Sequence, residues 1–247
     1  MDARISARRA AVRTARRRAR LRRTLLALLA LALAFGAVLL ERSTLMAVAR
    51  VDVVGLERLG RDEVVAATGI APGDPILRLR TGRAAAAVAA LPAVRTAEVD
   101  RTGTTSVRIA VEERRPVLVA RGRGTEVLLD RDGVVVGPGP ADLPVVELVA
   151  VPPDVGRSVV DDAALANAHR AWVGLSGPLR ARVVRLLAPD PDGLELVLTS
   201  GVTVRFGRAE DLAAKVRALG AVLADTAGSS VTVIDVRVPA VPTVRID

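Results

Sequence analysis

The residues of this sequence best placed for acid–base or metal chemistry are two pairs of aspartates. Asp130 and Asp132 lie two positions apart, as do Asp190 and Asp192, and paired carboxylates can share a proton or hold a divalent cation. In each pair the second aspartate directly precedes a glycine between two predicted strands, a position typical of a turn. Neither pair has the third acid and the distal glutamate of a calcium loop. We therefore interpret all four as turn-forming residues.

Other catalytic arrangements find little support in the composition. The chain of 247 residues contains one histidine, His169, and no cysteine, which excludes histidine clusters and thiolates as metal ligands. His169 lies near Trp172 on a predicted helix face, and no serine stands at the spacing of a nucleophile motif, so we interpret it as a packing or surface residue. The glycine-rich stretches 122–124 and 137–140 lack the lysine of a phosphate-binding loop. The sequence thus predicts no enzyme: no catalytic residue, no cofactor and no metal site.

The most apolar segment runs from Thr24 to Leu40, TLLALLALALAFGAVLL, and contains no charged residue. As a helix, its 17 residues would span about 25 Å, slightly less than the ~30 Å hydrocarbon core of a bilayer. The stems of Arg23 and Arg42 are long enough to bring their charges to the headgroups. A buried core helix is the alternative for a run of this length. The charged flanks favour a transmembrane helix over 24–40.

The segment before this run, residues 1–23, is strongly basic. It contains ten arginines and one acid, a net charge of +9 that equals the net charge of the whole chain. Residues 24–247 are therefore neutral on balance. The positive-inside rule places the tail in the cytoplasm and everything after Leu40 outside the plasma membrane, as in a single-pass protein.

Two alternatives concern the same region. The tail could bind nucleic acid, but it has no aromatic residue to stack on bases, so that interpretation rests on charge alone. Positive charge that sets the topology and contacts anionic lipid is the interpretation we prefer, and we predict no nucleic-acid partner. Ala47-Val48-Ala49 resembles the cleavage site of a signal peptide. The apolar run is longer than a signal peptide requires, and cleavage there would cut into the first predicted strand. An uncleaved anchor is the interpretation we prefer.

The chain after the anchor divides into two predicted parts. In the first, apolar alternation, glycines and Pro92 predict a strand at 50–53, helices at 60–68 and 83–91, and strands at 94–101 and 106–113. In the last of these strands Val107, Ile109 and Val111 share one face.

The second predicted part is an elongated antiparallel unit with two helices. The expected elements are a hairpin over 127–136, a short strand at 143–146, helices at 160–175 and 209–224, and strands at 180–188, 193–199, 202–206 and 231–238. The first helix has an apolar face of Leu165, Ala168, Trp172 and Leu175, and the second one of Leu212, Val216, Leu219 and Leu223. Pro239 and Pro242 have no N–H, so we expect them to stop strand pairing after Val238.

The order of these elements and several phrases of the sequence resemble a known family. PAVRTAEVDR (92–101) and above all VEERRPV (111–117) look like a POTRA domain, whose last strand typically ends in a phrase of the second kind. IDVRVP (234–239) resembles the phrase that closes the C-terminal domain in the FtsQ/DivIB family of bacterial cell division proteins. The resemblance covers essentially the whole chain. It implies an α+β fold with a basic cytoplasmic tail (1–23), a transmembrane helix (24–40), a β-α-α-β-β POTRA domain (47–116) and an FtsQ-type β-domain (117–247).

The resemblance also implies a function. Proteins of this family are scaffolds of the division septum that bind the coiled-coil proteins FtsB and FtsL outside the membrane and link divisome assembly in the cytoplasm to septal peptidoglycan synthesis. The family's FtsB contact lies on the last helix and the last strand. Carried over to this chain, it falls on Val233, Asp235, Arg237, Val238, Val241 and Val244.

The physical basis for such a contact is that a final strand often lies at a sheet edge, where unpaired backbone groups can accept a strand from a partner. The alternative is an ordinary strand that the chain itself covers. Where the family often has an aromatic residue after the arginine, this chain has Val238 and then Pro239.

Other functions of a POTRA protein are a membrane-tethered extracytoplasmic binding protein and an outer-membrane assembly factor. The assembly factor needs a C-terminal barrel of eight or more strands, which about 130 residues with two helices do not supply.

Overall fold

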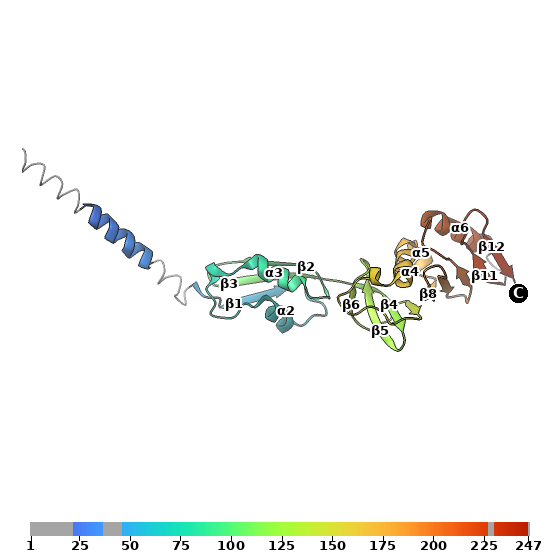
Figure 1. Ribbon diagram of the computed structural model, residues 1–247, viewed down its shortest axis with the longest axis horizontal. Coiled ribbons are helices and arrows are strands. Elements are labelled where there is room, and N and C mark those ends of the chain that lie inside the picture. Colours follow the sequence, from blue (N-terminus) through green and yellow to red (C-terminus); the bar gives the residue numbers. More distant parts are fainter. Residues whose placement is uncertain (1–21, 37–45, 227–229, 247) are drawn as a thin grey trace, which may run out of the picture. The chain divides into compact units, whose positions relative to one another are not determined.

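The computed structural model describes residues 22–36, 46–226 and 230–246 (Figure 1). The chain forms two compact units. The first contains the segments up to Val54, 61–85 and 98–110, and the second contains the segments 55–60, 86–97 and 111–247.

The predicted transmembrane helix, 24–40, lies partly outside the described residues. Residues 22–36 form a helix with exposed side chains, among them Leu31 and Phe35. Residues 37–40 and most of the basic tail lie outside the described ranges. Nowhere in those ranges does a helix combine the length and the apolar character that crossing a membrane requires. The anchor and the tail stay predictions.

A three-stranded sheet follows, with the strand order β1-β3-β2. Its elements are β1 (Arg50–Val54), α2 (Arg61–Thr68), the 3-10 turn η2 (Ile76–Arg78), α3 (Thr81–Ala89), β2 (Val94–Arg101) and β3 (Ser106–Glu113). β1 pairs in parallel with β3, which is possible because the helical segments between them provide a crossover connection. The predicted strand-helix-helix-strand-strand order is therefore confirmed. Val107, Ile109 and Val111 are buried, as the alternation in β3 predicted.

Nine further strands form one sheet in the order β12-β11-β10-β9-β8-β7-β4-β5-β6. They are β4 (Pro116–Gly122), β5 (Thr125–Asp130), β6 (Val135–Pro138), β7 (Val145–Leu148), β8 (Val183–Ala188), β9 (Glu195–Leu198), β10 (Thr203–Arg205), β11 (Val231–Asp235) and β12 (Thr243–Ile246). The prediction of an antiparallel unit was wrong, because β4 pairs in parallel with β7, β7 with β8, and β10 with β11. Helices connect β7 to β8 and β10 to β11, and such crossovers allow neighbouring strands to run in parallel.

Three α-helices accompany this sheet rather than the two predicted: α4 (Ala163–Gly174), the four-residue α5 (Gly177–Arg180) and α6 (Leu212–Asp225). A single turn such as α5 is too short to produce a periodic pattern in the sequence. The start of α4 is set by Asp162, whose Oδ1 accepts a hydrogen bond of 2.9 Å from the N–H of Leu165. The predicted inner face of α4 is buried as expected, with Leu165 and Ala168 fully enclosed.

The inner face of α6 contains a lysine that the sequence pattern did not single out. Leu219 is fully buried as predicted, and Lys215 beside it is only 4% exposed. The Nζ of Lys215 donates hydrogen bonds to the carbonyl oxygens of Phe206 (2.9 Å) and Arg208 (2.7 Å) and lies 5.3 Å from the centroid of the Phe206 ring. Burial lowers the pKa of Lys215, although nearby acids, Glu210 first, act in the opposite direction. Lys215 thus ties the loop after β10 to α6.

The VEERRPV phrase has a structural role. The buried carboxylate of Glu113 accepts hydrogen bonds from the N–H groups of Glu57 (2.8 Å), Arg58 (3.0 Å) and Leu59 (2.9 Å). Burial raises the pKa of Glu113, but these backbone donors outweigh it, so the pKa lies below its ordinary value. Arg114 donates a hydrogen bond of 2.6 Å to Asp130.

Candidate partner-binding site

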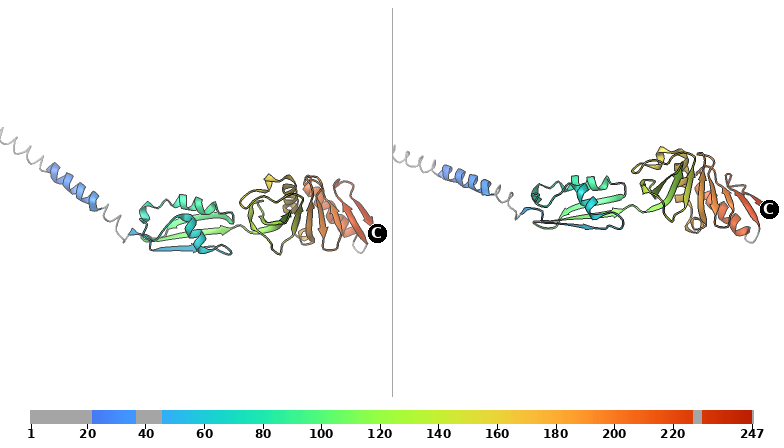
Figure 2. Two further views of the ribbon diagram at one scale, coloured as in Figure 1. Left: turned by 60° about the horizontal axis from the view of Figure 1, so that its bottom comes forward. Right: turned by 90° about the horizontal axis from the view of Figure 1, so that it is seen from below.

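β12 is the outermost strand at one side of the nine-stranded sheet (Figures 1 and 2). It pairs antiparallel with β11, with Thr243 opposite Asp235 and Val244 opposite Ile234. All four side chains of β12 are exposed. Among the described residues, none other than those of β11 bonds to the backbone of β12.

This edge lies one strand later than the sequence predicted. The predicted strand 231–238 ends at Asp235 and lies between β10 and β12. The chain then turns, with a hydrogen bond of 3.1 Å from the N–H of Val241 to the carbonyl oxygen of Val238. Pro239 and Pro242 lie in or beside this turn, and pairing resumes at Thr243. A proline removes only its own N–H from a ladder, so it ends a strand without preventing the next one.

The side chains around this edge are mainly apolar. Val238, Val241 and Ile246 are 63%, 68% and 58% exposed, and Val244 is 43% exposed. Residues directly opposite in an antiparallel pair share a face, so Val244 lies on the same face as Ile234, which is fully buried in a core that also includes Leu219 of α6. The apolar face of the core therefore continues onto β12 and ends there. We call β12 and the turn 237–242 the edge site.

The predicted contact residues fall into two groups, one exposed in the edge site and one engaged within the sheet or with each other. Val238, Val241 and Val244 belong to the edge site and are exposed, whereas Val233 is partly buried and lies between two neighbouring strands. Ile246 was missed. The alternation in Thr243-Val244-Arg245-Ile246 is a strand signal that the two preceding prolines obscured.

Asp235 and Arg237 are engaged with each other. The Nε and Nη2 atoms of Arg237 donate hydrogen bonds of 3.0 and 2.6 Å to the carboxylate of Asp235. The hydrogen bond from Arg237 lowers the pKa of Asp235, and burial opposes it. Asp235 in turn raises the pKa of Arg237. This pair holds the end of β11 in place at the start of the turn.

The aspartate pairs form turns, as predicted. The Oδ1 of Asp130 accepts hydrogen bonds from the N–H groups of Asp132 (3.0 Å) and Val134 (2.8 Å), and the Oδ1 of Asp190 accepts one of 2.7 Å from the N–H of Asp192. His169 is a packing residue, buried with its Nε2 3.0 Å from the carbonyl oxygen of Asp130. Among the residues that the structure describes, no three histidine or acidic side chains are grouped so that they could hold a metal ion.

Comparison with known proteins assigns both parts of the chain to one family. The family model of the POTRA domain, FtsQ-type, matches residues 46–114, and that of cell division protein FtsQ/DivIB, C-terminal, matches residues 117–237. Three relatives are each named cell division protein FtsQ. The relative from Mycolicibacterium smegmatis is 33% identical over 87% of this chain, that from Mycobacterium leprae is 34% identical over 70%, and that from Streptomyces collinus is 33% identical over 88%.

The relatives differ in length. This chain spans 62% of the M. smegmatis protein and 50% of the M. leprae protein, but 85% of the S. collinus protein. Both family matches together include every predicted contact residue up to Arg237, and residues 238–247 lie beyond them.

Proposed function

Since the chain belongs to the FtsQ/DivIB family of cell division proteins, we propose that it is a membrane-anchored scaffold of the division septum. Its partners in this proposal are FtsB-like and FtsL-like coiled-coil proteins, which it binds outside the membrane. The protein thereby links divisome assembly in the cytoplasm to septal peptidoglycan synthesis. It acts by binding, not by catalysis.

The anchor in this proposal is the transmembrane helix at 24–40. Its support is the uncharged run of 17 residues that follows a tail with a net charge of +9, a combination that orients a single-pass protein with its N-terminus in the cytoplasm. The three-stranded and the nine-stranded sheets then lie outside the membrane.

The observation that carries the partner-binding proposal is the open strand β12. An FtsB-like partner adds an extended segment to this edge, so that backbone hydrogen bonds supply affinity and the exposed valines and Ile246 supply specificity. Because no aromatic residue lies in the edge site, aliphatic burial has to provide the apolar part of the binding energy. The partner covers the apolar face that ends at Val244 and Ile246.

The test is binding of the purified full-length chain to the extracytoplasmic part of an FtsB-like partner from the same organism. We expect the double variant Val244→Asp with Ile246→Asp to bind roughly 30-fold more weakly, the loss expected when an interface hot spot is removed. Val149→Asp is the matched control, because Val149 is 62% exposed and lies outside the edge site. Wild-type affinity of the double variant, with an unchanged circular dichroism spectrum, would exclude this surface.

Topology and cellular role need separate measurements. Because the chain has no cysteine, a single cysteine at Val149 reacts with a membrane-impermeant maleimide in intact spheroplasts if the units are outside, and protection of it would contradict the proposed orientation. Depletion of the protein should give filamentous or branched cells without septa. Normal septation after depletion would refute a role in division.

A further inference from the structure

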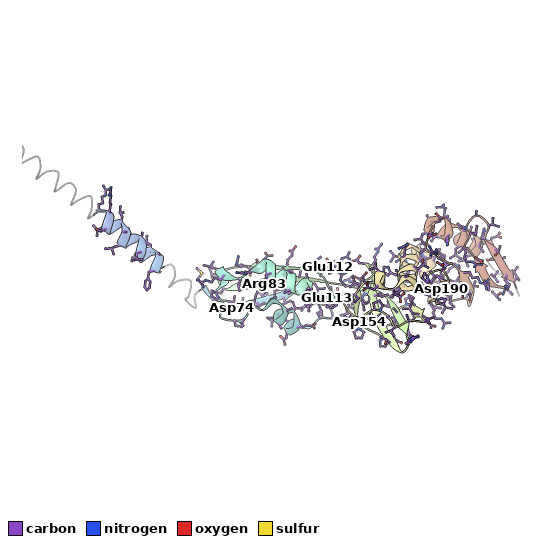
Figure 3. The ribbon with its side chains drawn as sticks, viewed as in Figure 1. Asp74, Arg83, Glu112, Glu113, Asp154 and Asp190 are labelled. Atoms are coloured by element: carbon purple, nitrogen blue, oxygen red, sulfur yellow. The ribbon has the colours of Figure 1, made fainter. Side chains whose placement is uncertain are left out.

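Three segments of the first unit meet at the end of its sheet where β1 begins. The N–H of Val48 donates to the carbonyl oxygen of Asp74 (2.8 Å), the N–H of Gly73 to that of Val48 (2.9 Å), and the N–H of Ala49 to that of Thr105 (2.8 Å). Figure 3 shows Asp74 and Arg83 at this end. We call residues 47–50, 71–83 and 100–106 the basic end.

The basic end concentrates positive charge in a chain that is neutral over residues 24–247. It contains two acids, Asp74 and Asp100, against five arginines, a net charge of +3. All five arginines are exposed; they are Arg50, Arg78, Arg80, Arg83 and Arg101. The carboxylate of Asp74 is engaged within its own turn, since its Oδ2 accepts a hydrogen bond of 2.8 Å from the N–H of Ala71.

One large apolar side chain points outward at the same place. Leu77 is 60% exposed, although Ile76 before it is 1% exposed and belongs to the core. The loop that carries Leu77 is held by Arg101, whose Nε donates a hydrogen bond of 2.8 Å to the carbonyl oxygen of Ile76 and whose Nη2 donates to that of Leu79. Leu77 is therefore presented to solvent by an ordered loop, directly before the exposed Arg78.

We propose that the basic end docks on the anionic lipid headgroups at the outer surface of the membrane, with Leu77 inserted among them. This rests on the proposed anchor at 24–40. Six residues separate Leu40 from Ala47, and even a fully extended chain of that length reaches only about 25 Å. The basic end is also the end of the three-stranded sheet that the chain reaches from the anchor, because Val48 and Ala49 are bonded into it. Arginine clusters next to a bilayer are attracted to anionic lipids, and a nearby apolar side chain adds to that binding.

The charge pattern distinguishes this surface from an ordinary solvated face. The other end of α3 is the segment Ala85-Ala86-Ala87-Val88-Ala89, which has no charge. The basic side chains of α3 and of the turn before it, Arg80 and Arg83, thus lie at the end where the chain enters the unit. A lipid surface is the one anionic partner that the proposed tether necessarily keeps within reach.

The experiment uses the full-length chain reconstituted into liposomes, with an environment-sensitive fluorophore on a single cysteine. Gly82→Cys reports on the basic end, because Gly82 is exposed and a Cβ there meets no atom within 4 Å. Ala89→Cys on the same helix is the control position, about 10 Å further along α3. Spin-labelled lipid should quench the Gly82→Cys fluorophore strongly in liposomes of phosphatidylglycerol with phosphatidylcholine. In liposomes of phosphatidylcholine alone, quenching of the Gly82→Cys fluorophore should be several-fold weaker. In the anionic liposomes, the Ala89→Cys fluorophore should be quenched less than the Gly82→Cys fluorophore.

Charge reversal provides the second arm. Arg80→Glu with Arg83→Glu should reduce the docked fraction by at least about tenfold, since each arginine near an anionic surface contributes roughly a fivefold factor. Equal quenching at the two positions, or quenching that the double variant leaves unchanged, overturns the docking proposal. An alkaline carbonate wash separates this failure from failure of the anchor. A chain that stays in the membrane but is not quenched retains the anchor and loses the docking, whereas a chain that the wash removes loses both.

Discussion

The two edges of the nine-stranded sheet are built in opposite ways. At one edge, β6 is covered by the chain itself: the N–H of Val135 donates to the carbonyl oxygen of Arg157 (2.9 Å), and the N–H of Gly156 donates to that of Val135 (2.8 Å). Pro138 ends this strand without an N–H to offer. At the other edge, β12 has neither a covering loop among the described residues nor a proline within the strand.

The two edges differ in how they are protected against pairing with a further strand. Open strand edges promote unwanted association, and proteins usually cover them or interrupt them. β6 follows that rule, with Val135 and Val136 buried, whereas the four residues of β12 are exposed. β12 is thus the edge that the described part of the chain leaves uncovered, and this contrast supports the proposed edge site.

The covered edge should be the sensitive one for stability. Val135 is fully buried, so Val135→Asp places an unpaired charge in the core, and we expect it to lower the free energy of unfolding by more than about 4 kcal/mol. Val244→Asp at the open edge should change it by less than about 0.5 kcal/mol, as exposed substitutions generally do. Urea unfolding followed by circular dichroism measures both. Equal losses would show that the two edges do not differ as described.

The turn that leads into β6 should show the next largest loss of stability on mutation. Asp130 is 3% exposed and accepts hydrogen bonds from Arg114 and two backbone N–H groups. Asp130→Ala leaves the partly buried guanidinium of Arg114 without this carboxylate, and we expect a loss of about 3–5 kcal/mol in the free energy of unfolding. Asp190→Ala, in the exposed β8–β9 turn, is the control and should cost about 1 kcal/mol. A similar cost for both variants would mean that burial of Asp130 contributes nothing.

The smallest expected effect concerns pH at the open edge. The pKa of Asp235 is lower in the folded protein, because Arg237 donates a hydrogen bond to its carboxylate. Its stabilising contribution is therefore present above the unfolded-state pKa, near about 3.9, and is lost as the pH falls through the folded-state value. The wild type should lose stability more steeply below about pH 4 than Asp235→Asn does. The effect is small because Arg237 is exposed to solvent.

This prediction is tested by measuring the thermal unfolding of the wild type and of Asp235→Asn at a series of pH values from neutral to acid. Glu113, whose pKa is also low, loses its contribution in both proteins and cancels from the difference. Parallel acid profiles of wild type and Asp235→Asn would show that the pair does not stabilise the end of β11.

Features that depend on neighbouring residues could be predicted from the sequence. The buried face of α4, the alternation in β3 and the turn roles of Asp130 and Asp190 were all predicted correctly. Each depends on spacings of two to four residues, over which side-chain direction and local hydrogen bonding follow from backbone geometry.

Features that depend on which distant segments pair could not be predicted. The parallel pairing of β4 with β7, the burial of Lys215 and the position of the true edge at β12 involve segments that meet only when the sheet assembles. Thr243–Ile246 has the alternation of a strand, but these four residues do not determine whether a tenth strand pairs with their free side. Residue order thus determined the family, the element types and the local turns of this protein. Strand neighbours, and with them the free edge, were decided by assembly of the sheet, because backbone N–H and C=O groups pair with whatever strand the fold brings beside them.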